Sequence, residues 1–170
     1  MRPPYGANCL VTIGGVSCGP VTIPNSPSSG WVDLANGGVP LRCWWAEPEA
    51  STNDFVSQSS KNRVYIVLPE VFGLNAWVRN VVDRLAAQGC TALAVPLFAR
   101  TAPDLELAYD ASGLVEGRRH KDATTSEQIL ADVAAAVSGF RARYPQAAIH
   151  VVGFCFGGAC RFSGSHVAGG

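Results

Sequence analysis

The sequence predicts an α/β domain with a mostly parallel sheet, helices on both faces and a leading antiparallel hairpin. Three short apolar runs, 63–70, 91–95 and 148–152, have the composition of strands buried on both faces. Two segments between these runs space their apolar residues at the helical period. Strands that alternate with helices in this way are typical of parallel strands joined by helical crossovers.

Length and composition restrict the class of protein. The chain has 170 residues, of which 48% are hydrophobic and 15% charged, so it is long enough to bury one core. Its 13 basic and 13 acidic side chains cancel, which argues against a nucleic-acid partner and against binding to an anionic membrane. No apolar run approaches the roughly 18 residues that a membrane helix needs. The six cysteines are irregularly spaced and do not indicate a disulfide framework, so we expect a protein of the reducing cytoplasm.

The first part of the chain contains an extension and then the hairpin. Residues 1–30 are rich in Pro, Gly, Ser and Asn and have no sustained hydrophobic period, so we expect a poorly ordered extension. The partial folded domain is then expected over 31–170. Its first two strands, 31–34 and 39–46, flank the sequence NGG at 36–38, which is a signal for a hairpin turn.

Two helices are expected between the inner strands. Residues 75–89 have helical spacing, with Asn75 suited to cap the start and Gly89 the end. Residues 126–143 place their apolar side chains on one helical face. The stretch 96–124 between them is polar and has little period, so we expect a long excursion there.

The cysteines and histidines do not form the pattern of a metal site. No two cysteines have C-x-x-C spacing, and the three histidines lie far apart, so we expect no metal. Two of the cysteines, Cys43 and Cys90, lie in apolar segments and are expected to be buried thiols. The six cysteines are Cys9, Cys18, Cys43, Cys90, Cys155 and Cys160.

An acid, a base and a thiol follow the three inner strands. The first of these strands ends at Glu70, the second runs into Arg100 and the third ends at Cys155. Ligands of open parallel sheets bind at the carboxyl ends of the strands, so these side chains are expected on one functional rim. Taken alone, Glu70 and Arg100 are explained as well by solvation at a strand end.

The sequence around Cys155 has the shape of a nucleophile elbow. Gly153-x-Cys155-x-Gly157 matches the pattern G-x-S-x-G with cysteine in place of serine. The glycines permit a sharp turn from strand to helix, and the helix N-terminus favours a thiolate. The backbone N–H of Phe156 can then face an oxyanion. A structural cysteine in a glycine-rich turn is the alternative interpretation.

Three segments together resemble the dienelactone hydrolase family of the α/β-hydrolase fold. They are LPEVFGLN at 68–75, ALAVPLFAR at 92–100 and VVGFCFGG at 151–158. They occur in the family's order and at about its separations, and the resemblance covers roughly residues 31–158. The joint pattern is specific, whereas each motif by itself is not.

The resemblance implies a reaction and a set of site residues. Cys155 would be the nucleophile, and Glu70 would contact the resting thiol and help to activate it. Arg100 would hold a substrate carboxylate, while the backbone N–H groups of Val71 and Phe156 would form the oxyanion hole. The family reaction is hydrolysis of an enol-lactone or a similar small, carboxylate-bearing ester through an acyl-enzyme. It implies no cofactor.

The aspartate and histidine of the family's triad would lie well after the elbow, and the sequence ends first. His166 and His150 are each about 15 Å from Cys155 along a helix or a strand. His120, in the polar excursion, is the one histidine for which a place at the rim stays open. We therefore expect a C-terminally truncated member of the family that is nearly inactive as it stands.

The alternative is a protein without catalysis. Three parallel strands and a hairpin would leave an open sheet edge where further strands of the family would pair. The chain would then be a non-catalytic module, or a truncated and non-functional product, whose open edge pairs with a partner chain. A defined complex would favour this alternative, and a stable monomer would count against it.

Overall fold

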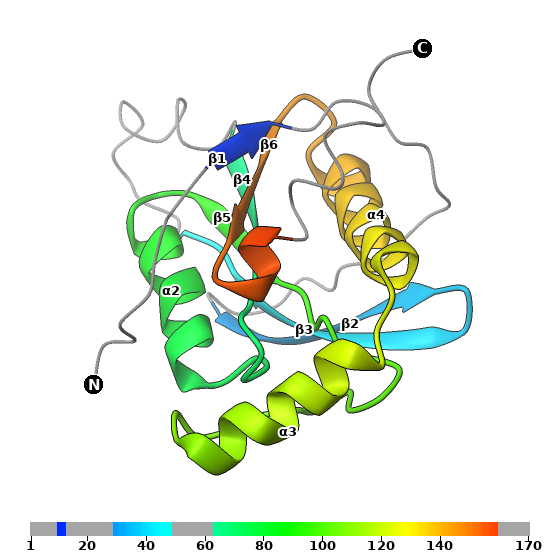
Figure 1. Cartoon of the computed structure of the whole chain (residues 1–170). Helices are drawn as coiled ribbons and strands as arrows, with labels where there is room; N and C mark the ends of the chain where they lie inside the picture. Colours follow the sequence, from blue (N-terminus) through cyan, green and yellow to red (C-terminus); the bar gives the residue numbers. More distant parts are fainter. Residues whose placement is uncertain (1–9, 13–28, 49–62, 160–170) are drawn as a thin grey trace.

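A six-stranded sheet with the strand order β1-β6-β4-β5-β3-β2 forms the centre of the molecule. The computed structural model describes residues 10–12, 29–48 and 63–159 (Figure 1). The strands are β1 (Leu10–Thr12), β2 (Ser29–Asn36), β3 (Val39–Ala46), β4 (Arg63–Leu68), β5 (Thr91–Ala94) and β6 (Ala148–Gly153). The helices are α2 (Ala76–Ala87), α3 (Ala111–Asp122) and α4 (Ser126–Arg143).

The predicted parallel core and leading hairpin are confirmed. β4 lies between β5 and β6 and is parallel to both, with Val64 opposite Thr91 and Arg63 opposite Ala148. β3 pairs antiparallel with β5, and β2 pairs antiparallel with β3. Gly37 and Gly38 have φ values of 55° and 89° and connect the hairpin. Positive φ at both central residues is typical of the turn that matches the twist of a β-hairpin.

Helices cover both faces of the sheet, as Figure 1 shows for α2 and α4. The alternation of side chains along each strand divides the core in two. Ile66 of β4 belongs to the cluster that includes Val133 and Phe140 of α4. Val67, the next residue of β4, belongs to the cluster that includes Val82 of α2. Burial of both faces explains why the inner strands are apolar throughout.

Both expected helices begin at capping residues. The side chain of Asn75 accepts hydrogen bonds from the backbone N–H groups at the start of α2, and Gly89 follows the helix with a φ of 84°. Thr125 and Gln128 form a reciprocal capping box at the start of α4. Such caps satisfy N–H groups that have no partner inside the helix.

The helix α3 was not expected. It lies within the polar stretch 96–124, and its buried residues are Gly113, Gly117 and His120, so it has no apolar stripe from which to predict it. The Asp110 carboxylate accepts from the N–H of Gly113 at 2.7 Å and caps the start of the helix. The helix α3 is therefore defined by the Asp110 cap and by close packing at its glycines, since it has no amphipathic pattern.

The sheet edge that was expected to be open is occupied along half of β6. β1 pairs antiparallel with β6, with Leu10 opposite Val152 and Thr12 opposite His150. The prediction of an open edge is therefore wrong for these residues, because a segment from 1–30 fills it. Most of the predicted extension over 1–30 lies outside the described residues.

The remaining sequence predictions concern cysteines, metals and membranes. Cys43 and Cys90 are buried free thiols, as expected, whereas Cys9, Cys18 and Cys160 lie outside the described residues. Among the described residues, no three acidic, histidine or cysteine side chains gather in a way that would hold a metal ion. Within the same residues, no helix has the length and apolar character needed to cross a membrane.

Candidate active site

Cys155 occupies a strained turn between β6 and a short helical turn at 156–159. Its φ is 48°, and it is the one non-glycine residue with positive φ in the described part of the chain. A left-handed conformation costs a non-glycine residue about 1–3 kcal/mol and is concentrated at functional sites. Cys155 is also exposed. The turn therefore presents the thiol to solvent at the carboxyl end of the sheet.

Glycines allow the turn to lie directly against the end of β4. A Cβ atom on Gly157 would lie 2.5 Å from the carbonyl oxygens of Leu68 and Pro69. A Cβ atom on Gly153 would lie 2.4 Å from the carbonyl oxygen of Gly157. Instead, the N–H of Gly157 donates to the Pro69 carbonyl at 3.1 Å. This close contact joins the cysteine turn to the segment that carries Glu70.

Glu70 is buried and has one side-chain partner in the described residues. It is 6% exposed. The Tyr109 hydroxyl donates to its Oε1 atom at 2.7 Å. Burial raises the pKa of Glu70, and the hydrogen bond from Tyr109 opposes that change. No hydrogen bond joins the Glu70 carboxylate to the Cys155 thiol, and the contact expected between them stays a prediction; the two residues belong to adjoining turns.

Val71 and Phe156 supply the two N–H groups that were predicted to bind an oxyanion. Val71 follows Glu70 directly, and Phe156 is the first residue of the helical turn after Cys155. Neither N–H donates a hydrogen bond within the described part of the chain. The carbonyl group of Val71 is held by close packing of α3, because a Cβ atom on Gly117 would lie 2.3 Å from its oxygen.

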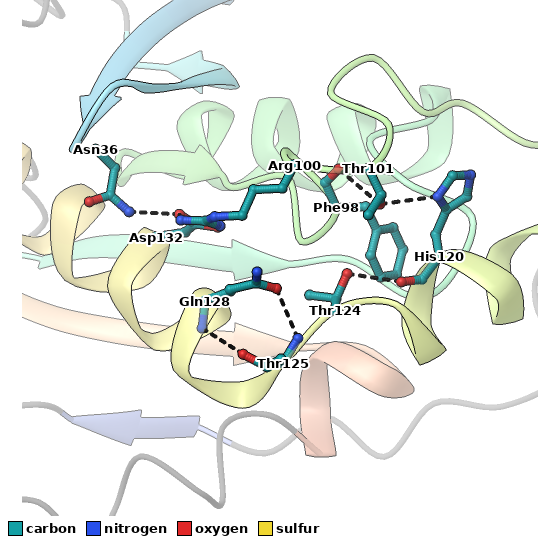
Figure 2. A network of polar contacts seen from close by, with 9 residues as sticks. All are labelled: Asn36, Phe98, Arg100, Thr101, His120, Thr124, Thr125, Gln128 and Asp132. Carbon is teal, nitrogen blue, oxygen red and sulfur yellow. Dashed lines mark hydrogen bonds and ion pairs between the residues drawn. The ribbon is translucent and has the colours of Figure 1, made fainter.

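Arg100 forms an ion pair with α4. Its Nη1 and Nη2 atoms donate to the two carboxylate oxygens of Asp132 at 2.7 and 3.0 Å. The Asp132 side chain is fully buried and also accepts from the Asn36 amide at 2.7 Å (Figure 2). The guanidinium thus connects the loop after β5 with α4 and the hairpin turn. The role of Arg100 toward a substrate carboxylate stays a prediction.

His120 reaches the rim region, but both of its ring nitrogens have partners. Nδ1 lies 3.1 Å from the Thr101 hydroxyl, and Nε2 lies 3.1 Å from a Glu116 carboxylate oxygen. The ring is 6.1 Å from that of Phe98, which in turn stacks on Phe156 at 6.0 Å. Figure 2 shows the imidazole beside Phe98 and Thr101. His120 is therefore near the elbow but forms no hydrogen bond with the thiol.

His150 does not complete a triad either. His150 stacks on Tyr65 with the ring centroids 5.1 Å apart, and its ring nitrogens are buried without a hydrogen-bond partner in the described residues. Burial, and to a lesser extent the charge of Arg63, lower the pKa of His150. His166 lies outside the described residues. No described histidine is hydrogen-bonded to Cys155.

A small cavity lies beside the predicted site. It has a volume of about 100 Å³ and is formed between the hairpin and the segment 102–106, with Trp31, Arg42 and Leu105 in its lining. None of the five predicted site residues lines it. The cavity is therefore separate from the predicted site residues.

Comparison with known proteins found matches both in sequence and in structure. A family model described as the dienelactone hydrolase family matches residues 52–169. A Synechocystis protein, named provisionally as a carboxymethylenebutenolidase, is 36% identical over 130 residues, which are 75% of this chain and 49% of the relative. The chain thus spans about half the length of the curated relatives that it matches.

Solved structures show the same fold. A Klebsiella pneumoniae protein, provisionally a dienelactone hydrolase, has a TM-score of 0.57 at 24% identity and aligns over 76% of this chain and 50% of its own. A Xanthomonas campestris α/β serine hydrolase without a lid has a TM-score of 0.52 at 18% identity, over 84% of this chain and 56% of its own. The fold of the described residues is that of an incomplete α/β-hydrolase.

Proposed function

Because this chain belongs to the dienelactone hydrolase family, we propose that it cleaves small carboxylic esters or lactones with Cys155 as the nucleophile. The observation that carries the proposal is the left-handed backbone of Cys155, with a φ of 48°, at an exposed turn after a parallel strand. A structural cysteine has no reason to occupy a strained conformation in which its thiol faces solvent.

The proposed reaction begins with loss of the thiol proton. The Cys155 thiolate attacks the ester carbonyl carbon, a C–S bond forms and the carbonyl electron pair moves onto oxygen. The N–H groups of Val71 and Phe156 donate to that oxyanion. Collapse of the intermediate expels the alcohol or enolate, which takes a proton. Water then hydrolyses the thioester and releases the acid and the thiol.

Glu70 is proposed as the acceptor of the thiol proton. Its turn is joined to the cysteine turn by the Gly157–Pro69 hydrogen bond. Burial raises the pKa of Glu70 and so makes the carboxylate a stronger base than one in water. Arg100 is proposed to favour substrates that carry a carboxylate. Two of its five N–H donors bond Asp132, and the other three are left for a second anion.

The same site is proposed to acylate faster than it turns over. The second step needs a group that activates water, and no described histidine is bonded to Cys155. We therefore expect the acyl-enzyme to accumulate. The proposed location of the reaction is the cytoplasm, where thiols stay reduced.

The test is acylation of the 170-residue chain by p-nitrophenyl acetate. We expect release of roughly one equivalent of p-nitrophenolate per chain, followed by slow turnover, with the acyl group found on Cys155 by peptide mass spectrometry. Cys155→Ala should abolish the burst, whereas the matched variant Cys90→Ala should retain it. A burst that survives in Cys155→Ala, or the absence of any burst, contradicts the proposal.

A further inference from the structure

Tyr109 is the only side chain bonded to the Glu70 carboxylate in the described residues. Its hydroxyl donates to Oε1 at 2.7 Å. Neither the fold prediction nor the family motifs pointed to this residue, which lies in the stretch 96–124. Tyr109 thus bonds a buried carboxylate that directly precedes Val71, the residue proposed to bind the oxyanion.

The backbone fixes Tyr109 at this place. The N–H of Leu107 donates to the Phe72 carbonyl at 3.0 Å, and the N–H of Leu74 donates to the Leu105 carbonyl at 3.1 Å. The Tyr109 ring packs on the Phe72 ring with the centroids 4.6 Å apart. The segment before α3 is thus attached to the residues that follow Glu70. Tyr109 itself is 40% exposed, so it is not a core residue whose role is explained by packing alone.

The hydroxyl can only donate to the carboxylate. Burial raises the pKa of Tyr109, so the phenol stays protonated at neutral pH. A hydrogen bond donated to a carboxylate stabilises its ionised form. A carboxylate stabilised in this way is a weaker acceptor for the proton of a neighbouring thiol.

We propose that Tyr109 is a positioning residue whose hydrogen bond restrains Glu70 from accepting the proton of the Cys155 thiol. This inference rests on the proposed function, because it requires Cys155 to react as a thiolate. In the restrained step the S–H bond breaks, its electron pair stays on Sγ and an O–H bond forms on Glu70. Cys155 and Glu70 together carry one negative charge before and after the transfer, so no further reactant is needed.

Other ionisable groups in this part of the molecule belong to α2, α3, α4, the loop after β5 and the segment before α3, and on α3 they include His120 and Glu116. On α3, the Lys121 ammonium lies 5.9 Å from the centroid of the Phe156 ring. On α2, Arg79 pairs with Glu106 of the segment before α3 at 2.6 Å. On the loop after β5, Arg100 pairs with Asp132. All of these groups remain when only the Tyr109 hydroxyl is removed, so their effects cancel in the comparison below.

The experiment measures the reactivity of Cys155 toward iodoacetamide as a function of pH, with peptide mass spectrometry to separate this thiol from the others. Tyr109→Phe keeps the ring on Phe72 and removes the hydroxyl. We expect alkylation roughly three- to tenfold faster than in the wild type near neutral pH, as a change of about half to one pKa unit gives. The two rates should converge at alkaline pH, where the thiol ionises without Glu70. The matched control Tyr65→Phe, whose hydroxyl contacts neither turn, should match the wild type.

A second background separates restraint of Glu70 from a general loosening of the structure. In Glu70→Gln there is no carboxylate to restrain, so adding Tyr109→Phe should leave the alkylation rate unchanged. A rate increase that persists in that background overturns the inference, and so does a single variant Tyr109→Phe with the wild-type profile. The proposed function fails separately, by the absence of Cys155 acylation in the wild type.

Discussion

The turn at Cys155 is fixed by backbone contacts, whereas the segment between β5 and α4 is fixed by side chains. In the turn, glycine backbone lies against the carbonyl groups of Leu68 and Pro69, with no room for a Cβ atom. In the segment, Arg100 bonds Asp132 and His120 bonds Thr101. Cys155 is therefore placed by main-chain contacts that require glycine at their closest points, and the segment between β5 and α4 by contacts between particular side chains.

The largest expected effect tests the backbone-held turn. Gly157→Ala places a methyl group 2.5 Å from two carbonyl oxygens, which the backbone can relieve only by moving. We expect a loss of about 3 kcal/mol in the free energy of unfolding, measured by urea denaturation. The matched variant Gly158→Ala brings a methyl group 3.3 Å from its nearest atom, the carbonyl oxygen of Gly153, and should cost about 1 kcal/mol or less. Equal losses in the free energy of unfolding for Gly157→Ala and Gly158→Ala would show that close main-chain contact at Gly157 does not hold the turn.

A smaller effect is expected in the region held by side chains. Asp132→Asn removes a fully buried charge whose partner, Arg100, has a side chain that is 25% exposed. Breaking a buried pair costs about 3–5 kcal/mol, and the partial solvation of Arg100 reduces the expected loss to about 2 kcal/mol. Denaturation of Asp122→Asn provides the control, because that carboxylate is exposed and should contribute only a few tenths of a kcal/mol. A stability for Asp132→Asn equal to that of the control would show that the pair does not hold the segment.

The smallest effect concerns a histidine of the sheet. Burial lowers the pKa of His150 in the folded state, so between that pKa and about 6.5 the unfolded chain binds more protons than the folded one. Stability should therefore rise with pH through this window and be lost as the pH falls below about 6.5. Urea midpoints measured from about pH 5 to about pH 8 should show a shallower slope for His150→Phe than for the wild type. An unchanged slope would mean that His150 is not the group responsible.

The sequence predicted those elements whose signal is local or periodic. β3 was expected at its observed bounds, and Asn75 caps α2 as its position before the apolar period indicated. The placement of Cys155 at a turn after a parallel strand followed from the glycines around it. In each case the residues that carry the signal are neighbours in the chain, or lie within one helical turn of each other.

Contacts between distant residues were not predictable in the same way. Tyr109 and Glu70 are 39 positions apart, and Arg100 and Asp132 are 32 positions apart, so no local period connects them. Asp132 lies on a helix whose sequence indicated only an apolar face. β1 was not predicted because three residues are too few to show a strand period. Its partner β6 is also far away in the sequence, so no local signal indicates the pairing. The predicted roles of the site residues remain to be tested by the experiments above.

The packing of Gly157 on the end of β4 also bears on how the reactivity of this site can be altered. The glycine contacts that hold the turn at residue 155 are made by main-chain atoms, so they do not involve the side chain of residue 155 itself. Serine is close in size to cysteine, and Cys155→Ser would put an alcohol where the thiol stood without rebuilding the turn. The fold therefore fixes the position of the side-chain atom at residue 155, whether that atom is sulfur or oxygen.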